Sequence, residues 1–355
     1  MTVFRCHASE PDTDSPMYIR LVFYAKKRVL STLIFGIMSS CMKAISLDRI
    51  LELNISPETC LGWTGDAISR KDEVILPPKI SMKPDAPGCF YNSMPVIIPY
   101  LNVAGVKEVT RYPKRDPSLD SEILLYDLST GDALALLDGN WITAMRTAAA
   151  AVHSIKLFAK DGFCEIGMIG LGNIQRAVMT FLLSLYPGRR FKIKLYRYKD
   201  QHEQFANRFS DYEDLEFVYC DSYDETVKGS EVVISCATYF AENICDDDSF
   251  DEGVLVVPVH TRGFANCDRF FDRVFADDTA QVKSFSSFDE WKNYAEVADV
   301  VCGRASGRKN ERERIIVYNV GISLHDIYFA KKIYDLCADK CPEIDLGSPD
   351  KKFWI

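Results

Sequence analysis

Apolar residues first recur at helical spacing and then follow a pattern typical of strands. Leu47, Ile50 and Leu51 share a helical face after Ser46, which can cap a short helix. The next segments are rich in Val, Ile and Tyr and are bounded by Pro and Gly. They predict strands at Glu73–Ser81, Cys89–Ile98, Gly105–Tyr112 and Ser121–Tyr126. We expect these strands to form a mostly antiparallel sheet.

From Thr143 the pattern changes to an alanine-rich helix, Ala144 to about Lys160. Beyond it, apolar strand segments alternate with amphipathic helical segments. The expected strands are 164–169, 191–196, 217–220, 231–237, 254–259 and 273–276, and the expected helices are 174–185, 200–209 and 223–228. Such alternation is typical of a doubly wound parallel sheet. After a charged loop that follows Gly307, an extended piece at 315–319 and a helix from Leu324 to about Ala338 return toward the first sheet.

Composition and charge narrow the functional class. The 355 residues are 47% hydrophobic, which is ample for a core and for two domains. The 42 basic and 51 acidic residues give a net charge of −9 and are scattered, so we expect no nucleic-acid partner. The twelve cysteines show neither a CxxC pair nor metal-ligand spacing with histidine. We therefore expect no metal, and reduced cysteines in a cytoplasmic protein.

The first forty residues are unusual. Lys26, Lys27 and Arg28 precede an apolar run, Val29–Met38. One interpretation is a short export signal, but the run is short for that role, follows a long polar lead and is too short to span a bilayer. We favour the alternative that residues 1–41 are an extension outside the folded protein, which would begin near Met38 or Met42, and we expect no membrane partner.

A glycine-rich turn carries the strongest functional signal. The apolar strand that ends at Ile169 is followed at once by Gly170-Leu171-Gly172 and then by a helical stretch that begins Asn173-Ile174. In a dinucleotide site the first glycine permits a tight turn, and the second lets backbone N–H groups approach the pyrophosphate at a helix N-terminus. The third glycine of the usual motif is absent, with Gln175 in its place. The surrounding βαβ pattern nevertheless predicts NAD or NADP as the cofactor.

The residue after the second strand bears on the choice between these cofactors. About 25 residues beyond Gly172, the strand 191–196 ends in Arg197, where an NAD-specific site normally has Asp or Glu for the ribose 2′-hydroxyl. An arginine suits a 2′-phosphate, so we favour NADP. The alternative is that Arg197 is simply solvated.

The segment Asp138-Gly139-Asn140-Trp141-Ile142-Thr143-Ala144-Met145-Arg146-Thr147-Ala148-Ala149 resembles the hallmark of the ornithine cyclodeaminase/mu-crystallin family. Further matches keep the family's order at Leu76–Lys79, Met94-Pro95, Ala104–Lys107 and Leu125–Gly131, with the Gly170 turn at the expected distance downstream. Together they cover roughly residues 42–330. An ordered series of this kind is far more specific than any one motif.

The resemblance implies an α/β protein, with a Rossmann doubly wound parallel sheet and a mostly antiparallel α+β domain for dimerisation and substrate binding. It divides the chain into 42–137 plus 310–355 (substrate and dimerisation) and 138–309 (dinucleotide binding). It also implies that Lys107 and Arg146 hold the carboxylate of a small amino acid, with Lys79 as a third basic residue. Without the resemblance, Lys107 reads as a strand-edge charge and Arg146 as a cap on a carbonyl. Lys79 stands where the family commonly has arginine, and a lysine cannot form the same bidentate contact with a carboxylate.

A departure from the family pattern lies at Val257–Gly263. Ornithine cyclodeaminases have an aspartate near this strand end, and the aligned residue here is Arg262. The arrangement is more similar to the branch that contains the siderophore-pathway dehydrogenase forming 2,3-diaminopropionate. This puts cyclisation of ornithine in doubt, because that reaction needs a base near the leaving ammonia. His260 is a catalytic candidate, although a lone histidine at a strand end is more often structural.

For two further pairs of residues the sequence leaves two alternative roles. Asp277 and Asp278 lie near the nicotinamide or cap a helix, and His325 with Asp326 begin the returning helix next to the nicotinamide or merely cap it. The expected catalytic residues are therefore Lys107, His260 and Arg262. The expected cofactor-binding residues are Thr147, Gly170, Gly172, Asn173, Ile174, Arg197 and Thr238.

The first functional hypothesis is an NAD(P)-dependent oxidoreductase that moves a hydride at the Cα–N centre of a small amino acid or its imine. The second is a cyclodeaminase that recycles its NAD and releases ammonia. The third follows the mu-crystallin precedent of a non-catalytic nicotinamide-dependent binding protein. In each case we expect a homodimer.

Overall fold

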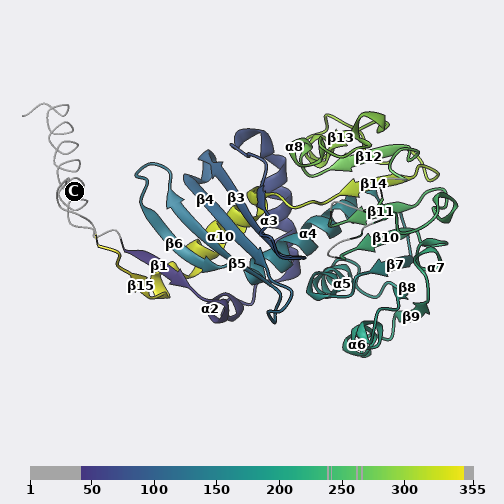
Figure 1. Ribbon diagram of the computed structural model, residues 1–355, viewed down its shortest axis with the longest axis horizontal. Coiled ribbons are helices and arrows are strands. Elements are labelled where there is room, and N and C mark those ends of the chain that lie inside the picture. The colour runs from purple at the N-terminus through teal and green to yellow at the C-terminus, as the bar shows by residue number, and fades with distance from the viewer. Residues whose placement is uncertain (1–40, 238–239, 241, 261–262, 265–266, 348–355) are drawn as a thin grey trace, which may run out of the picture. The chain divides into compact units, whose positions relative to one another are not determined.

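The computed structural model describes residues 41–237, 240, 242–260, 263–264 and 267–347. Residues 43–342 form one compact unit that contains two sheets (Figure 1). The expected extension, 1–41, lies almost wholly outside the described residues, as do Thr238 and Arg262. A short strand, β15 (Glu343–Ile344), follows the unit.

The first sheet is antiparallel except at one edge. Its strands lie in the order β1-β6-β5-β4-β3-β2, and only β1 runs parallel to its neighbour, β6. Their bounds are β1 (Met42–Ile45), β2 (Ile80–Met82), β3 (Phe90–Ile98), β4 (Val103–Arg111), β5 (Leu119–Asp127) and β6 (Ala133–Asp138). This confirms the expected mostly antiparallel sheet, with three of its four predicted strands placed within two residues at either end.

One face of this sheet is covered by helices. Helix α10 (Ser323–Cys337) packs on β3, β4 and β5 and against α3 (Pro57–Ser69) (Figure 1). Alternate residues of β4 face this layer and are buried. A Cβ on Gly105 of β4 would lie 2.7 Å from Ile327 Cδ1, so this glycine is what allows α10 to approach the sheet closely. Two positions later, Lys107 points toward the same layer.

The second sheet is wholly parallel. Its order is β13-β12-β14-β11-β10-β7-β8-β9. The chain therefore places β8 and β9 on one side of β7 and all later strands of this sheet on the other side. The bounds are β7 (Glu165–Ile169), β8 (Phe191–Tyr196), β9 (Leu215–Cys220), β10 (Val232–Ser235), β11 (Leu255–Pro258), β12 (Arg273–Ala276), β13 (Ala295–Glu296) and β14 (Ile315–Tyr318). Every residue of β10, β11, β12 and β14 is buried, which explains their continuous rather than alternating apolar runs.

The remaining helices connect and cover these strands. They are α2 (Leu47–Glu52), α4 (Asn140–Phe158), α5 (Asn173–Leu185), α6 (Gln201–Arg208), α7 (Tyr223–Val227), α8 (Thr279–Val282) and α9 (Val297–Val301). Short 3-10 turns lie at Lys71–Glu73, Pro99–Leu101, Asp247–Ser249, Phe288–Glu290 and Ala338–Lys340. Helix α4 packs against α3, α5 and β11. Its buried alanines permit this close packing in the core that both sheets share.

The predicted strand Glu73–Ser81 is wrong. Residues 71–73 form a 3-10 turn, Ile75 makes only an isolated bridge with Ile97, and the strand is limited to Ile80–Met82. Pro77 and Pro78 explain the difference, because neither has an N–H to donate to a neighbouring strand. Helix α3, which begins with Pro57 at its first turn after the Ser56 cap, was not predicted.

The return of the chain to the first sheet begins later than the predicted boundary at residue 310. Strand β14 lies inside the parallel sheet, between β12 and β11. Only after Tyr318 does the chain leave this sheet to form α10. Residues 319–322 therefore link the two sheets.

The ends of the parallel strands determine where the site lies. Gly170 follows β7, His260 follows β11 by two residues, Asp277 follows β12 and Gly321 follows β14. Because the strands are parallel, all four residues lie at the carboxyl edge of the sheet. Ligands of doubly wound proteins bind at this edge, near the point where the strand order reverses. In the part of the chain that the structure describes, no helix has the length and apolar character needed to cross a bilayer.

Candidate active site

The glycine turn has the geometry that a dinucleotide requires. Gly170 has φ +79°, and a Cβ there would lie 2.5 Å from the backbone nitrogen of Ala237. At Gly172, by contrast, a Cβ would find nothing within 4 Å. Gly172 caps α5 without any side-chain hydrogen bond. The helix N-terminus is therefore available to an anion, and open space lies over the second glycine.

A cavity of about 820 Å³ lies at this turn. Ile169, Gly170, Leu171 and Gly172 line it, and further residues come from the ends of β8 and β10. The other lining residues are Lys83, Gly88, Cys89, Phe90, Arg111, Tyr196, Tyr198, Gln201, Tyr223, Cys236, Ala237 and Phe240. Its volume is in the range of small-molecule and cofactor sites. Its position between β7 and β10 is the reversal point of the sheet.

The two glycines offer a matched pair of substitutions. We expect Gly172→Ala to leave the free energy of unfolding nearly unchanged, because the new methyl group meets no protein atom. It should weaken dinucleotide binding about tenfold or more, because it fills the space where backbone approaches phosphate. Gly170→Ala should instead destabilise the fold by about 1–3 kcal/mol through backbone strain. Urea unfolding and cofactor titration of both variants test this, and unimpaired binding by Gly172→Ala would count against the site.

The other predicted cofactor residues have mixed positions. Asn173 and Ile174 begin α5. Thr147 donates a hydrogen bond to the carbonyl of Thr143 within α4. Arg197 is exposed, lies 3.4 Å from Asp221 and is not among the residues that line the cavity. Its role in cofactor choice stays a prediction.

A buried ionic cluster joins β4, α4 and α10. Asp326 Oδ1 accepts hydrogen bonds from Lys107 Nζ and from Arg146 Nε, both at 2.8 Å. Lys107 is 1% exposed, Arg146 6% and Asp326 0%. The two cations predicted to bind a carboxylate are thus brought together on a carboxylate of the protein itself. Neither is a strand-edge charge or a carbonyl cap.

The guanidinium of Arg146 keeps two nitrogens for a ligand. Its only polar partner among the described residues is Asp326, and that contact uses Nε alone. A Cβ on Gly321 would lie 2.7 Å from Arg146 Nη1, so the backbone there passes directly beside the guanidinium. Nη1 and Nη2 together have the fork geometry that matches a second carboxylate.

Burial and neighbouring charges shift the ionisation of this cluster. Burial, assisted by the nearby Arg146 charge, lowers the pKa of Lys107 to about 8. Burial alone would raise the pKa of Asp326, but Arg146 and Lys107 outweigh it and lower that pKa below its usual value. Asp326 is therefore ionised at neutral pH, and Lys107 remains mostly protonated.

Lys79 and Asp277 bind the backbone of the same link, at Val320 and Gly321. Lys79 Nζ donates to the carbonyl of Val320 at 3.1 Å, and Asp277 Oδ2 accepts from the N–H of Gly321 at 2.7 Å. Burial lowers the pKa of Lys79. Burial also raises the pKa of Asp277 to about 6, despite the opposing hydrogen bond from Gly321. Asp277 Oδ1 is buried and has no hydrogen-bond partner among the described residues.

Two further candidates, His260 and Asp278, make contacts within the protein itself. His260 Nε2 and Ser235 Oγ are 2.6 Å apart, and the His260 ring packs near Phe240 and Phe264. Asp278 does not cap a helix with its side chain but forms an ion pair of 2.6 Å with the buried Lys71. The catalytic role of His260 stays a prediction.

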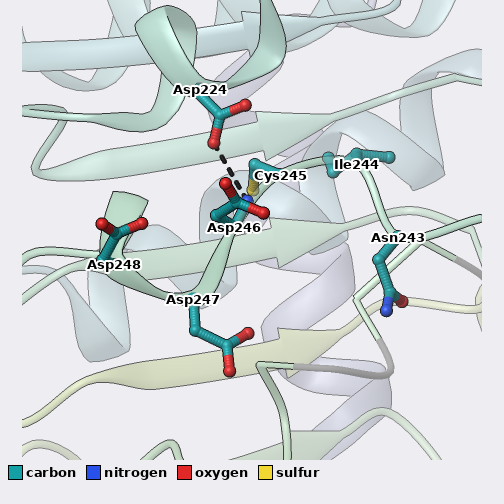
Figure 2. Close-up of a pocket in the computed structure, with 7 residues that line it drawn as sticks. All are labelled: Asp224, Asn243, Ile244, Cys245, Asp246, Asp247 and Asp248. Carbon is teal, nitrogen blue, oxygen red and sulfur yellow. Dashed lines mark hydrogen bonds between the residues drawn. The ribbon is translucent and has the colours of Figure 1, made fainter.

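A second pocket of about 690 Å³ is strongly acidic (Figure 2). Asp224, Asp246, Asp247 and Asp248 line it, and Asp224 accepts a hydrogen bond from the backbone of Asp246 at 3.0 Å. Carboxylates would repel the phosphates of a dinucleotide. Charge therefore assigns the cofactor to the glycine-lined cavity instead.

The contacts of Asp326 with the two predicted anchors were not foreseen. From the sequence, His325 and Asp326 were expected either to lie next to the nicotinamide or to cap the returning helix. In the structure Asp326 accepts hydrogen bonds from both predicted anchors, Lys107 and Arg146. One signal was present in the sequence, because Asp326 lies among the apolar residues Leu324, Ile327 and Phe329. In the structure the first eight positions of this helix are all buried. A charged residue in such a stretch needs a buried partner of opposite charge.

The fold and the glycine turn define a Rossmann-type protein with an added antiparallel domain. A family model described as the ornithine cyclodeaminase/mu-crystallin family matches residues 44–341, and the chain belongs to this family. This confirms the resemblance in the sequence motifs.

Individual members of the family share only a modest sequence identity with this chain. The chain is 29% identical to the nodulation efficiency protein NfeD of Rhizobium meliloti over 73% of its length and 83% of that protein. It is 26% identical to the N-((2S)-2-amino-2-carboxyethyl)-L-glutamate dehydrogenase of Staphylococcus aureus, over 60% of this chain and 66% of that one. The Δ(1)-pyrroline-2-carboxylate reductase of Thermococcus litoralis, solved with NADH and L-proline, superposes with a TM-score of 0.75 at 24% identity, covering 84% and 98% of the two chains.

Proposed function

We propose that the protein is an NAD(P)-dependent oxidoreductase that moves a hydride at the Cα–N centre of a small amino acid or its imine. One observation carries the proposal. A forked guanidinium with two available nitrogens, Arg146, and a dinucleotide-type glycine turn, Gly170–Gly172, belong to one compact unit, and the backbone beside Arg146 emerges from the same sheet edge as that turn.

The relatives support the chemistry. The Staphylococcus aureus relative is named as a dehydrogenase of an amino acid derivative, and the Thermococcus litoralis enzyme was solved with NADH and L-proline. In this chain the open space over Gly172 and the uncapped start of α5 fit the pyrophosphate of such a cofactor. A bound nicotinamide would supply the hydride acceptor or donor.

The ionic cluster would fix the substrate. Lys79, Lys107 and Arg146 are three cations against the two carboxylates of Asp326 and Asp277, and Asp277 is mostly ionised only above about pH 6. Positive charge therefore remains at the centre of the cluster, and a substrate carboxylate would neutralise it. Arg146 Nη1 and Nη2 would bind that carboxylate, and Asp326 holds Arg146 and Lys107 in position from behind.

Asp277 would transfer the proton to or from the substrate nitrogen. Oxidation of an amino acid to its imine removes a hydride from Cα and a proton from nitrogen, and reduction adds both. Asp277 has a buried oxygen with no partner among the described residues. Through its other oxygen it accepts a hydrogen bond from Gly321, the residue of the 319–322 link that lies beside Arg146. Its raised pKa lets it hold a proton at a higher pH than an ordinary aspartic acid does.

The expected pH dependence follows from that pKa. Below about pH 6 Asp277 is protonated and can donate, so imine reduction should slow as the pH rises through about 6. Asp277→Asn should lower the rate of reduction by about 10²-fold and remove this step from the profile. Rates measured from pH 5 to pH 9 in about half-unit steps test the idea. A variant profile that retains the same inflection would assign the proton to another group.

Net turnover decides between the functions open to the family. A panel of amino acids, and of 2-oxo acids with amines, is incubated with NAD and NADP while absorbance at 340 nm and ammonia are followed together. The proposal predicts a stoichiometric change in NAD(P)H. Ammonia release without net NAD(P)H would indicate a cyclodeaminase, and binding of nicotinamide without turnover of any substrate would indicate a binding protein.

A homodimer in the cytoplasm is part of the proposal. The face of the first sheet opposite α10 carries a cross-strand apolar row, in which Pro95, Val106, Leu124 and Leu136 pair in register. Leu136 is 38% exposed, and such a row is typical of a subunit interface. A monomeric mass of 40.2 kDa in solution would contradict the dimer.

The cytoplasmic location rests on the cysteines. Buried free thiols such as Cys60, Cys267 and Cys337 are typical of a reducing compartment.

A further inference from the structure

The two walls of the 820 Å³ cavity differ in charge. The wall formed by the parallel-sheet domain includes the glycine turn, Tyr196, Tyr198, Gln201, Tyr223 and Phe240. None of the described residues that line this wall is a lysine or an arginine. A dinucleotide carries at least two negative charges on its pyrophosphate, and the helix N-terminus offers only about half a charge against them.

The opposite wall supplies the missing charge. Lys83 follows β2, Arg111 ends β4, and both line the cavity together with Gly88, Cys89 and Phe90. Arg111 Nη1 donates to the carbonyl of Gly88, which holds the guanidinium against this wall. Lys83 is exposed and has no ion-pair or hydrogen-bond partner within the described part of the chain. These are the two cations among the described lining residues.

No carboxylate lines the cavity among the residues that the structure describes. A site that selects NAD uses an acidic side chain to hold the ribose 2′-hydroxyl, and the same charge repels a 2′-phosphate. Here Tyr196 ends β8, and Tyr198 and Gln201 line the cavity in the segment that follows, where such a residue would stand. Arg197, which the sequence suggested for the 2′-phosphate, lies beside Asp221 instead.

We propose that Lys83 and Arg111, from the antiparallel domain, bind the phosphate groups of the dinucleotide across the cleft and thereby determine cofactor affinity. This inference rests on the proposed function. The phosphate can be the pyrophosphate that NADH and NADPH share or the 2′-phosphate that only NADPH carries. In both cases the antiparallel domain takes part in cofactor binding as well as in substrate binding.

The test is a titration of the full-length protein with NADH and with NADPH, followed by nicotinamide fluorescence. We expect Lys83→Ala, and Lys83→Ala with Arg111→Ala, to raise the Kd about tenfold for each charged contact that is lost. Lys114→Ala is the matched control, because Lys114 carries the same charge shortly after β4 and does not line the cavity. The wild-type affinity should fall with added salt, and the double variant should show a weaker dependence.

The two cofactors identify the phosphate. Weakening confined to NADPH assigns the contact to the 2′-phosphate, and equal weakening for both cofactors assigns it to the pyrophosphate. Arg111→Lys keeps the positive charge, so it should bind the dinucleotide more tightly than Arg111→Ala does. A purely structural role of Arg111 through Gly88 would not predict this recovery. Unchanged Kd values in both variants would overturn the inference while leaving the proposed function intact. Wild-type protein that binds neither cofactor would instead overturn the proposed function.

Discussion

Replacing Arg146 with alanine is expected to lower kcat/KM by about two to three powers of ten, the cost of removing one partner of a buried charge pair. The substitution removes the guanidinium fork that would bind the substrate carboxylate. It also removes one of the two cations that neutralise Asp326. Arg146→Lys keeps the charge and loses the paired donors, so its activity should fall between that of the wild type and that of the alanine variant.

Steady-state kinetics, together with thermal unfolding of each variant, measure this effect. Arg308→Ala is the control, since Arg308 is another arginine that donates to backbone carbonyls, those of Phe158 and Glu313. Glu313 precedes β14, so Arg308 lies at the amino edge of the parallel sheet, away from the site. We expect Arg308→Ala to lose stability but not kcat/KM. Full activity in Arg146→Ala would remove the basis for the proposed carboxylate site.

Replacing Asp326 with asparagine is expected to destabilise the protein by about 3–5 kcal/mol, because it leaves two buried cations without their shared anion. Lys107 Nζ and Arg146 Nε both bond to the same oxygen, Oδ1, so one substitution breaks both ion pairs. Urea unfolding near neutral pH measures the loss. Asp335→Asn on the same helix is the control, since its pair with Lys331 lies at the surface and should contribute no more than about 1 kcal/mol.

The Asp326→Asn variant offers a second readout. An added carboxylate such as acetate should stabilise it more than it stabilises the wild type, because the ligand restores the missing anion between Lys107 and Arg146. Chloride at the same ionic strength controls for screening. Equal stabilisation of both proteins by acetate would mean that the ligand does not replace the missing anion.

The parallel sheet was predictable because its signal is local. Each strand, such as Phe191–Tyr196, is a short apolar run, and each helix follows within a few residues. The glycine turn was predictable for the same reason, since strand, turn and helix are contiguous. The strand predicted at Glu73–Ser81 failed because its apolar residues outweighed the two prolines in the pattern. Helix α3 was missed because its apolar face is weakly marked and interrupted by Gly62 and Gly65.

The organisation of the site could be predicted only in part. The resemblance to the family marked Lys107 and Arg146, but their common partner lies 219 and 180 residues away along the chain. No local pattern encodes such a contact. The cationic wall formed by Lys83 and Arg111 was not foreseen either, because it depends on how the end of β4 and the segment after β2 face the glycine turn.

A crystal structure of the protein with a nicotinamide dinucleotide and a small amino acid tests the proposed site most directly. We predict the pyrophosphate over Gly170 and Gly172, with the amino acid carboxylate on Arg146 Nη1 and Nη2. A dinucleotide bound elsewhere, or a carboxylate that does not touch Arg146, would contradict it.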